Sequence, residues 1–386
     1  MAWRDSMKIL ILSCNTGEGH NSSGKALQAA LRHHGVECDL KDTLAIKSAW
    51  LSKLVSDIYE FSIKVSLFGL VYKLAEQYSA QQFKFKSPIY SFSGLYAQKI
   101  AHLINDGHYD GVICVHLFPA EAITKIRRQY GQYVPAIFVM TDYTCIPLLY
   151  ETELDKYVIP HPDLIDEFKN KGLISNRLKA IGIPVNEDHF ITRVPKEEAR
   201  SLVNMFFDWR EANGKWFLIM GGSMGFGKIS ELVRQLRKHI TKEDRIVCIC
   251  GKNEKLKKQI KKLFPVSSVV KVLGYTSKIS LIMDACDVLL TKPGGITSTE
   301  ALIKNIPLVH INPIKGLEEY NSAFFKKKGM AYRGDTLEEQ VEMAIQLSSN
   351  RVAQEKMTET QRLNSNLNCS NDIADLIINM AQPPQS

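Results

Sequence analysis

The sequence predicts an α/β protein made of two doubly wound parallel sheets that face each other across a cleft. Apolar runs typical of buried strands alternate with helical patterns from end to end, as in chains of βα units. The 386 residues also exceed the roughly 250 to 300 residues at which a single hydrophobic core usually divides. The pattern restarts once, beyond the Gly and Pro residues of segment 180–190. We therefore expect an N-terminal domain of residues 1–184 and a C-terminal domain of residues 185–386, whose last helix could pack back on the N-terminal domain.

The expected strands are short apolar runs bounded by turn residues. They cover residues 8–13, 111–115, 136–140, 156–159, 216–220, 245–250, 269–273, 288–290 and 307–311. Such runs are typical of strands buried on both faces of a parallel sheet. A long helical pattern, residues 196–213, begins the second half.

Residues 44–100 interrupt this rhythm as a long insertion between early strands. The insertion holds seven lysines, three acidic residues and the aromatic residues Trp50, Tyr59, Phe61, Phe68, Tyr72, Tyr78, Phe83, Phe85, Tyr90, Phe92 and Tyr96. Basic, aromatic, amphipathic helices of this kind are typical of a membrane interface. The alternative is a pair of helices packed on its own domain.

The composition favours an anionic partner and reduced cysteines. The formal charge of +8 fits a nucleotide sugar, a nucleic acid or an anionic membrane surface, and does not choose among them. The eight cysteines are scattered without a Cys-x-x-Cys pair, so we expect buried free thiols. The lysines of residues 252–262 would spread around a helix, which favours a solvated face over nucleic-acid binding.

No stretch of the sequence has the length and composition of a membrane span or a secretory signal. No window approaches the ~20 apolar residues that a transmembrane helix needs, and the apolar stretch 9–12 is too short for a signal peptide. We therefore expect a cytoplasmic protein, either soluble or held peripherally at the inner membrane face.

Segment 288–300 carries the most specific chemical signal in the chain. An apolar run breaks at the Pro-Gly-Gly of residues 293–295, and a helical pattern, residues 297–303, follows. Glycines at a helix start let a diphosphate approach free backbone N–H groups, where the helix dipole favours negative charge. Glu300 would lie about 8 Å farther along the axis and could accept hydrogen bonds from both hydroxyls of a ribose. The segment predicts half of a nucleotide-diphosphate site, and an ordinary strand–turn–helix junction is the alternative.

Two further glycine-rich turns follow expected strands. They are residues 13–20, Ser-Cys-Asn-Thr-Gly-Glu-Gly-His, and residues 221–225, Gly-Gly-Ser-Met-Gly. Because open α/β sheets bind ligands at the carboxyl ends of their strands, we expect all three turns to line one crevice.

Together, these motifs resemble the monogalactosyldiacylglycerol synthase and processive diacylglycerol glucosyltransferase family. The resemblance rests on Gly-x-Gly-His at 17–20, Gly-Gly-Ser-x-Gly at 221–225, Gly-Lys-Asn at 251–253, Gly-Tyr at 274–275 and Lys-Pro-Gly-Gly-x-x-x-x-Glu at 292–300. It extends from about Lys8 to about Gly334, and the second half is also similar to the enzyme that adds N-acetylglucosamine to the lipid-linked peptidoglycan precursor. It implies a GT-B fold and inverting transfer of a sugar from a UDP-sugar to a membrane lipid hydroxyl.

The resemblance implies a role for each matching residue. The residues expected at the diphosphate are Gly222, Ser223, Gly225, Gly294 and Gly295; Gly274 and Tyr275 would bind uracil through main chain, and Glu300 the ribose. The expected donor site is completed by Gly19, Asn253, Glu318 and Asn321. The expected catalytic residues are His20 and Asp142, and the expected acceptor contact is His116.

Inverting transfer needs a base for the acceptor's proton and a means of stabilising the UDP leaving group. An imidazole such as that of His20 suits the first task near neutral pH. Each of the three residues also has a structural alternative. His20 could simply hydrogen-bond its loop, Asp142 could cap the following turn, and His116 could pack in the core.

Two positions depart from the family's pattern. Leu317 stands where the family usually has a glutamine that can hydrogen-bond the sugar, so the sequence does not identify the donor sugar. Ile146 and Pro147 stand where many members have His-x-x-Trp, so the sequence does not identify the acceptor either. The sequence has no Asp-x-Asp or His-x-x-x-His motif, and helix N-termini can stabilise a leaving diphosphate. We therefore expect no metal and no cofactor.

The expected partners are a UDP-sugar, a lipid acceptor and an anionic membrane surface, without nucleic acid. Two other functions remain open. A UDP-sugar epimerase of the same architecture needs no acceptor pocket, so it leaves the insertion 44–100 unexplained. A non-catalytic protein that senses a UDP-sugar and binds a partner would bind the donor without turnover.

Overall fold

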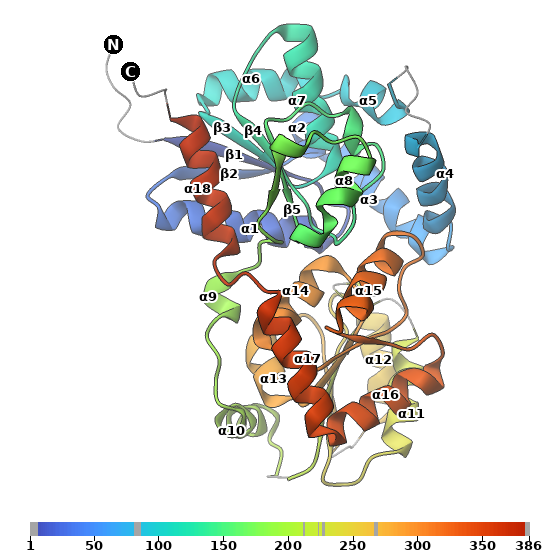
Figure 1. The fold of residues 1–386 in the computed structure, drawn as a ribbon. Helices are drawn as coiled ribbons and strands as arrows, with labels where there is room; N and C mark the ends of the chain where they lie inside the picture. Colours follow the sequence, from blue (N-terminus) through green and yellow to red (C-terminus); the bar gives the residue numbers. More distant parts are fainter. Residues whose placement is uncertain are drawn as a thin grey trace. The chain divides into compact units, whose positions relative to one another are not determined.

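The computed structural model describes residues 7–80, 86–210, 213–222, 224–225, 228–265 and 269–382. The chain divides into two compact units (Figure 1). Unit 1 comprises residues 1–187, 315–317 and 368–386, and unit 2 comprises residues 188–314 and 318–367. Two of the aromatic residues of the insertion, Phe83 and Phe85, lie outside the described residues.

Unit 1 is built on a six-stranded parallel sheet with the strand order β2-β1-β3-β4-β5-β6. The strands are β1 (Lys8–Ser13), β2 (Glu37–Asp42), β3 (Gly111–Cys114), β4 (Ala136–Val139), β5 (Lys156–Ile159) and β6 (Leu178–Ala180). The helices are α1 (Glu18–His33), α2 (Thr43–Lys47), α3 (Ala49–Lys64), α4 (Phe68–Ala80), α5 (Pro88–Ser93), α6 (Ala97–Gly107), α7 (Leu117–Tyr130), α8 (Ile165–Asn170) and α18 (Cys369–Ala381), with three short 3-10 helices, η1 (Leu149–Glu151), η2 (Pro162–Leu164) and η3 (Ser175–Arg177). The strand order reverses beside β1, and right-handed crossovers therefore place helices on both faces of the sheet.

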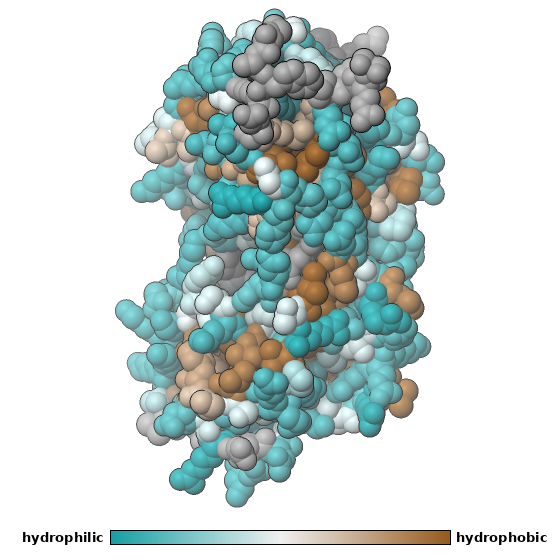
Figure 2. All heavy atoms as spheres, turned by 90° about the vertical axis from the view of Figure 1, so that its left-hand side faces the viewer, coloured by the Kyte–Doolittle hydropathy of each residue, from teal (hydrophilic) through white to brown (hydrophobic). Residues whose placement is uncertain are grey.

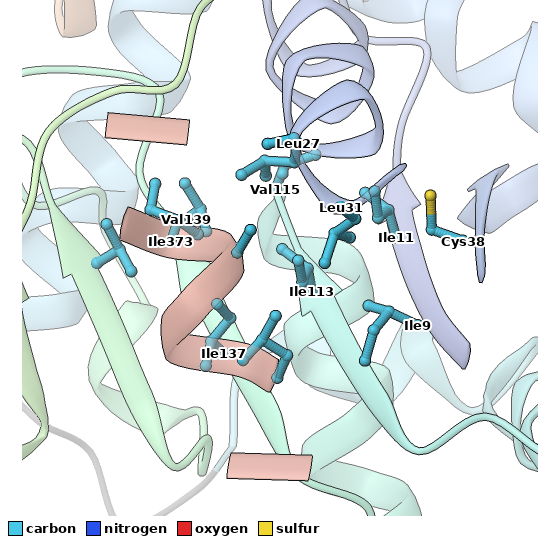
Figure 3. Packing of buried hydrophobic residues seen from close by; sticks show 14 of the residues in the cluster. Ile9, Ile11, Leu27, Leu31, Cys38, Ile113, Val115, Ile137, Val139 and Ile373 are labelled. Carbon is cyan, nitrogen blue, oxygen red and sulfur yellow. The ribbon is translucent and has the colours of Figure 1, made fainter. Parts of the chain in front are cut away.

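One face of this sheet is covered by α1 and α18, which come from opposite ends of the chain (Figure 3). Ile9 and Ile11 are two residues apart on β1, so both side chains point to this face. The residues that α18 contributes are Cys369, Ile373, Ala374 and Ile377, spaced as one face of a helix. Since full burial of an isoleucine contributes about 1.5 to 3 kcal/mol, α18 is an integral part of the core of unit 1.

Unit 2 has a second six-stranded parallel sheet, with the order β12-β11-β10-β7-β8-β9. Its strands are β7 (Trp216–Met220), β8 (Arg245–Ile249), β9 (Val270–Leu273), β10 (Val288–Thr291), β11 (Leu308–His310) and β12 (Tyr332–Arg333). Its helices are α10 (Lys196–Phe207), α11 (Ile229–Lys238), α12 (Glu254–Leu263), α13 (Ile279–Ala285), α14 (Gly295–Lys304), α15 (Leu317–Lys328), α16 (Leu337–Ser349) and α17 (Arg351–Leu363); the short α9 (Glu187–Phe190) spans the boundary of the two units. All eight cysteines of the chain are buried and free, as expected.

The expected strands are confirmed to within a residue or two at their ends, but three others were missed. They are β2, β6 and β12, and each lies at the edge of its sheet. An edge strand is less covered than a central one, so its sequence need not be apolar; β2 reads Glu-Cys-Asp-Leu-Lys-Asp. The helix expected over residues 196–213 is also too long, because α10 ends at Phe207 and the next residue, Asp208, adopts a left-handed conformation.

The insertion forms α2, α3, α4 and α5 and the start of α6. Two of these helices turn apolar side chains to solvent, namely Trp50, Leu54, Ile58, Phe61 and Val65 along α3, and Leu67, Leu70, Val71 and Leu74 along α4. Spacings of three and four residues place each set on one side of its helix. We call these residues the α3–α4 face. Figure 2 shows the left-hand side of Figure 1, whereas α4 lies on the right in that view. The side shown in Figure 2 is mostly hydrophilic, with separate hydrophobic groups.

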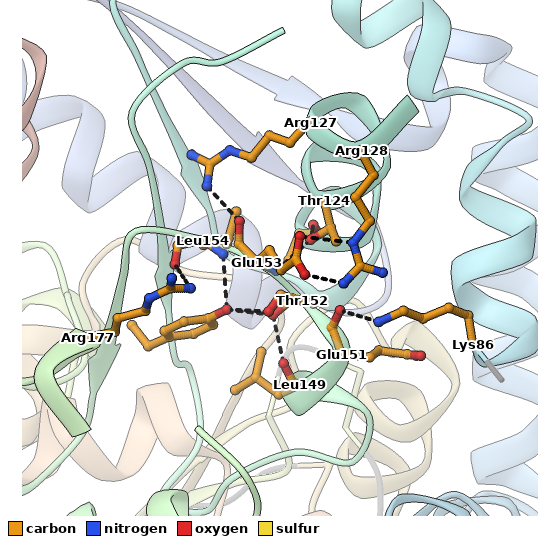
Figure 4. Close-up of polar contacts among 12 residues, drawn as sticks. Lys86, Thr124, Arg127, Arg128, Leu149, Glu151, Thr152, Glu153, Leu154 and Arg177 are labelled. Atoms are coloured by element: carbon orange, nitrogen blue, oxygen red, sulfur yellow. Dashed lines mark hydrogen bonds and ion pairs between the residues drawn. The ribbon is translucent and has the colours of Figure 1, made fainter. Parts of the chain in front are cut away.

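A polar network fixes η1 and the residues after it to α7 (Figure 4). Arg127 donates to the carbonyl oxygen of Glu153 at 2.6 Å, and Arg128 forms an ion pair with the carboxylate of Glu153. From the segment before α5, Lys86 donates to the carbonyl oxygen of Glu151 at 3.1 Å. These bonds fix the end of the long connection between β4 and β5. The beginning of the same connection contains Asp142, one of the expected catalytic residues.

Glu121, buried in α7 beside this network, should make the stability depend on pH. Burial, together with the charge of Glu151, raises the pKa of Glu121 to about 9 from an ordinary value near 4.5. Between these values the folded state binds a proton that the unfolded chain does not, so stability falls as pH rises, by at most about 1.4 kcal/mol per pH unit. The variant Glu121→Gln removes this dependence. Its free energy of unfolding, measured in urea, should therefore rise relative to that of the wild type from pH 5 to pH 8.

Glu153→Gln is the matched control, because the pKa of Glu153 is shifted in the opposite direction. The hydrogen bond from Arg128 to the Glu153 carboxylate lowers this pKa. Its contribution is present at neutral pH and lost as pH falls into the acid range, the opposite direction. If the free energies of unfolding of Glu121→Gln and the wild type change equally between pH 5 and pH 8, Glu121 is not protonated in the folded protein.

Candidate functional site

The carboxyl ends of β1 and β3 meet where the strand order of unit 1 reverses. Open α/β sheets bind ligands at such a switch point, because the loops on its two sides diverge. The loop after β1 leads to His20 in the first turn of α1, and the loop after β3 leads to His116, the residue before α7. The two imidazole rings lie edge to face with their centroids 4.7 Å apart. Unit 1 therefore brings together two of the residues expected to serve the acceptor.

Hydrogen bonds fix the tautomer of His20. Its Nδ1 lies 2.8 Å from the carbonyl oxygen of Val115, which can only accept, so Nδ1 carries the proton and Nε2 has a lone pair. The hydroxyl of Thr141 lies 3.2 Å from the same Nδ1 and donates to the carboxylate of Asp142 at 3.3 Å. Both expected catalytic residues, His20 and Asp142, thus belong to one hydrogen-bonded chain with Thr141 between them.

Burial keeps both imidazoles neutral, because it disfavours the charged form. It lowers the pKa of His20 to about 4, an effect that the hydrogen bond to Val115 only partly offsets. It also lowers the pKa of His116 well below its ordinary value, and the neighbouring His20 adds to the effect. A neutral His20 with a lone pair on Nε2 is able to accept a proton.

His116 caps a helix. Its Nδ1 accepts a hydrogen bond at 3.1 Å from the backbone N–H of Phe118, in the first turn of α7. This satisfies one of the backbone donors that a helix start leaves without a partner. The cap accounts for the position of the ring, and the expected contact with the acceptor stays a prediction.

Side chains connect the turn before α1 to the insertion. The carboxylate of Asp42 accepts hydrogen bonds from Asn15 and from Ser52, both at 2.5 Å. Asn15 in turn accepts a hydrogen bond from Asn21 at 2.8 Å. Since Ser52 lies on α3 and Asn21 follows His20 in α1, the polar chain links the helix that carries half of the α3–α4 face to the turn that positions His20.

In unit 2 the strand order reverses between β7 and β10, and the two expected phosphate-binding turns follow these strands. Gly222 and Gly225 have φ values of +71° and +58°, which other residues rarely adopt. A Cβ at Gly222 would lie 2.4 Å from Cε of Lys292, and one at Gly225 would lie 2.8 Å from the carbonyl oxygen of Cys250. Glycine therefore avoids backbone strain at both positions, and at Gly225 it also avoids a clash with the backbone. Ser223, the third expected residue of this turn, lies outside the described residues.

Asn253 supports this turn. Its Oδ1 caps α12 by accepting a hydrogen bond from the N–H of Leu256 at 2.9 Å, and its Nδ2 donates to the carbonyl oxygens of Met224 at 3.2 Å and Gly225 at 3.4 Å. These bonds use both ends of the amide. The geometry thus gives Asn253 a positioning role, and its expected contact with the donor stays a prediction.

Gly294 immediately precedes α14 and Gly295 is its first residue, so the expected helix start is confirmed. Glu300 lies in the second turn of α14 and is half-buried. No described residue donates a hydrogen bond to its carboxylate or forms an ion pair with it, and burial raises the pKa of Glu300 to about 8. A half-buried carboxyl group with a raised pKa and no protein donor is typical of a ligand-binding position.

Two residues of α15 hold the Pro-Gly-Gly turn. The carboxylate of Glu318 pairs with Lys292, with Nζ and Oε1 2.5 Å apart, and accepts from the N–H of Ile314 at 2.9 Å. Asn321 is fully buried and donates to the carbonyl oxygen of Pro293 at 2.9 Å. Asn321 therefore positions the turn. Lys292 opens the motif at residues 292–300, yet the sequence pattern alone predicted no role for it.

The remaining expected donor residues lie at the ends of elements. Gly274 and Tyr275 directly follow β9, and the Tyr275 side chain is 75% exposed, which fits a main-chain role. Gly19 lies in the first turn of α1 in unit 1. The expectation that all three turns line one crevice concerns both units and stays a prediction.

Among the residues that the structure describes, no group of three or more His, Cys, Asp or Glu side chains is placed to hold a metal ion. No helix formed by them is long and apolar enough to cross a membrane.

Comparisons with known proteins agree with this geometry. The family model of monogalactosyldiacylglycerol (MGDG) synthase matches residues 20–185, and that of the glycosyltransferase family 28 C-terminal domain matches residues 217–377. A processive diacylglycerol beta-glucosyltransferase of Staphylococcus carnosus is 28% identical over 368 residues, which cover 91% of this chain and 87% of the relative.

Solved structures share the fold at low sequence identity. A MurG of Acinetobacter baumannii has a TM-score of 0.63 at 15% identity, with 97% of this chain and 100% of that chain covered. The UDP-GlcNAc 2-epimerase of Neisseria meningitidis, bound to UDP-GlcNAc, has a TM-score of 0.62 at 13% identity, with 97% and 100% covered.

Two parallel sheets, each with a switch point at the carboxyl ends of its strands, define the GT-B fold. The family models and the named relative show that the chain is a glycosyltransferase of this fold. Within that class, the chain belongs to the monogalactosyldiacylglycerol synthase and processive diacylglycerol glucosyltransferase family, part of glycosyltransferase family 28.

Proposed function

We propose that this enzyme transfers a sugar, with inversion, from a UDP-sugar to the hydroxyl of diacylglycerol or a similar lipid at the cytoplasmic face of a membrane. The observation that carries the proposal is His20, a neutral imidazole with a lone pair on Nε2 at the switch point of unit 1. The name of the Staphylococcus carnosus relative supports diacylglycerol as acceptor, and the epimerase bound to UDP-GlcNAc supports a UDP-sugar as donor.

In this mechanism, Nε2 of His20 takes the proton of the acceptor hydroxyl while the hydroxyl oxygen bonds to the anomeric carbon of the sugar. The bond from that carbon to the diphosphate breaks on the opposite face, and its electron pair leaves with UDP. Thr141 links the imidazolium that forms to the carboxylate of Asp142, which stabilises its charge. The backbone at Gly222, Gly225 and the start of α14 receives the charge of the diphosphate.

A transfer assay with several UDP-sugars and vesicles that contain diacylglycerol tests this function. We expect UDP release that requires the lipid, and a glycolipid whose anomeric configuration is opposite to that of the donor. A product with the donor's configuration would refute the inverting mechanism. An epimerase would change the sugar without lipid, and a sensing protein would bind the donor without releasing UDP with any acceptor.

Activity should survive chelation, because the glycine-rich turns and the N-terminus of α14 can accept the charge of the leaving diphosphate without a metal. Turnover is measured with and without an excess of EDTA. Loss of turnover in EDTA, followed by rescue with Mg²⁺ or Mn²⁺, would show that a metal takes part.

The α3–α4 face should dock the enzyme on anionic membranes. Its apolar side chains are exposed on two neighbouring helices, and the side chains of Lys47, Lys53, Lys64 and Lys73 are exposed beside them. Basic residues near an anionic surface contribute about 1 kcal/mol each. Replacing these four lysines by glutamine should weaken co-sedimentation with anionic vesicles, and should reduce transfer to a lipid far more than binding of UDP.

Lysines of α12 provide a matched control. Replacing Lys255, Lys258, Lys261 and Lys262 by glutamine removes the same charge from unit 2 and should leave vesicle binding close to that of the wild type. Wild-type binding should also weaken with added salt. Equal sedimentation of wild type and the α3–α4 variant, at low and high salt, would leave the insertion a structural element and favour a soluble acceptor.

A further inference from the structure

We propose that Lys292 contacts the diphosphate of the donor and neutralises the charge that develops on it as the sugar leaves. The inference rests on the proposed function, because it takes a nucleoside diphosphate as the ligand of unit 2. It adds a cationic side chain to a site that otherwise consists of glycine turns and a helix N-terminus.

Lys292 stands at the switch point of unit 2. It directly follows β10, and its aliphatic stem runs past the turn after β7, since a Cβ at Gly222 would lie 2.4 Å from its Cε and 3.6 Å from its Nζ. Its partner Glu318 lies beside the second turn, because a Cβ at Gly294 would lie 3.7 Å from Oε1 of Glu318. The ammonium group is therefore held between the two turns that are expected to bind the phosphates.

The surroundings of Lys292 suit a phosphate-binding cation. Its side chain is 18% exposed and that of Glu318 7%, so the charges lie in a setting where electrostatic interactions are stronger than in water. An ammonium group has three N–H donors. One of them donates to Glu318 at 2.5 Å, and no other described side chain or carbonyl group accepts from the rest. The ammonium can therefore keep its bond to Glu318 and still donate to a phosphate oxygen.

Glu318 has the role of a positioning residue in this arrangement. Its second oxygen accepts from the N–H of Ile314 at 2.9 Å, which fixes the carboxylate and, through it, the ammonium of Lys292. During transfer, the bond between the anomeric carbon and the diphosphate oxygen breaks, and both electrons stay on that oxygen. Lys292 stabilises the resulting charge by hydrogen bonding and transfers no proton.

The competing explanation is that Lys292 and Glu318 form a purely structural ion pair. In that case, removing both charges together would leave the donor site intact, since well-packed neutral residues often replace a buried pair without loss. If Lys292 contacts the diphosphate, removing both charges should still weaken the binding of a diphosphate. Binding of a ligand without phosphate should stay the same in either case.

The experiment compares wild type, Lys292→Met, Lys292→Arg and the double variant Lys292→Met with Glu318→Gln, by calorimetry with uridine and with UDP and by transfer assay. Methionine keeps the stem that packs against Gly222, and the double variant leaves no unpaired carboxylate. We expect uridine affinity to be unchanged throughout, and UDP affinity to fall about tenfold to a hundredfold in both methionine variants, as for loss of a hydrogen bond to a charged group. Turnover should fall at least as much, and arginine should restore part of both.

Wild-type UDP affinity and turnover in the double variant would overturn the role of Lys292 and leave the ion pair structural. A wild-type protein that binds neither uridine nor UDP would instead refute the proposed donor, so the two failures are distinguishable. Thermal unfolding of each variant shows whether the fold is intact, and the unchanged affinity for uridine provides a second test of the same point.

Discussion

Replacing His20 with alanine is expected to lower turnover about a hundredfold or more while the affinity for UDP stays unchanged. A general base contributes typically about 10² to 10⁴ in rate, and His20 lies in unit 1, whereas the turns expected to bind the phosphates lie in unit 2. Turnover is measured at saturating donor and lipid, and UDP affinity by calorimetry. Wild-type turnover in this variant would place the base elsewhere, with Asp142 as the first candidate.

Two neighbouring substitutions sharpen this test. Thr141→Val removes the hydroxyl that links His20 to Asp142 and keeps the shape of the side chain, so we expect a smaller loss of turnover than for His20→Ala. His34→Ala removes a histidine whose side chain bonds only to Ala30 and Asp375 among the described residues, and should leave turnover unchanged.

The pH dependence should follow the lowered pKa of His20. Because this pKa is about 4, the neutral, proton-accepting form is populated down to about pH 5. The acid limb of kcat/KM should therefore lie well below the ordinary imidazole value near 6.5. The unfolded chain binds a proton on this residue between the two values and the folded chain does not, so stability from His20 is lost as pH falls below about 6.5.

The sequence predicted all the central strands and the edge strand β9, and missed the other three edge strands, β2, β6 and β12. Each central strand is a continuous apolar run, because helices cover both of its faces. The edge strand β2 instead carries Glu37, Asp39, Lys41 and Asp42, since its outer side meets solvent. Polar composition and alternation cannot distinguish such a strand from a loop, and only pairing with β1 defines it.

The sequence also predicted the position of the candidate site better than it predicted the contacts of each side chain. Glycine motifs indicated both switch points, because glycine adopts left-handed backbone angles without strain and allows a close approach of other atoms. The bonds of Asn253, His116 and Asn321 depend on residues distant in sequence or on helix starts known only from the fold. Lys292 belongs to the same group: its position between two turns depends on β7 and β10 being neighbours.

Glu300→Ala should weaken UDP binding about a hundredfold or more and leave the fold intact. Two hydrogen bonds from ribose hydroxyls to a charged group correspond to about 3 kcal/mol or more, and no described residue depends on this carboxylate for a hydrogen bond. Calorimetry with UDP measures the change, and urea unfolding checks the fold. Unchanged UDP affinity would remove Glu300 from the donor site.

The same carboxylate should make binding of uridine depend on pH. In the unliganded protein, burial raises the pKa of Glu300 to about 8, so the group is mostly protonated at pH 7. Ribose hydroxyls that donate to Glu300 favour its ionised form, so binding should release a proton and strengthen as pH rises from 6 to 8. Uridine is the suitable probe because it lacks phosphates that titrate nearby. Glu300→Gln cannot ionise and should bind uridine equally at both pH values; a variant that keeps the wild-type pH dependence would show that another group titrates.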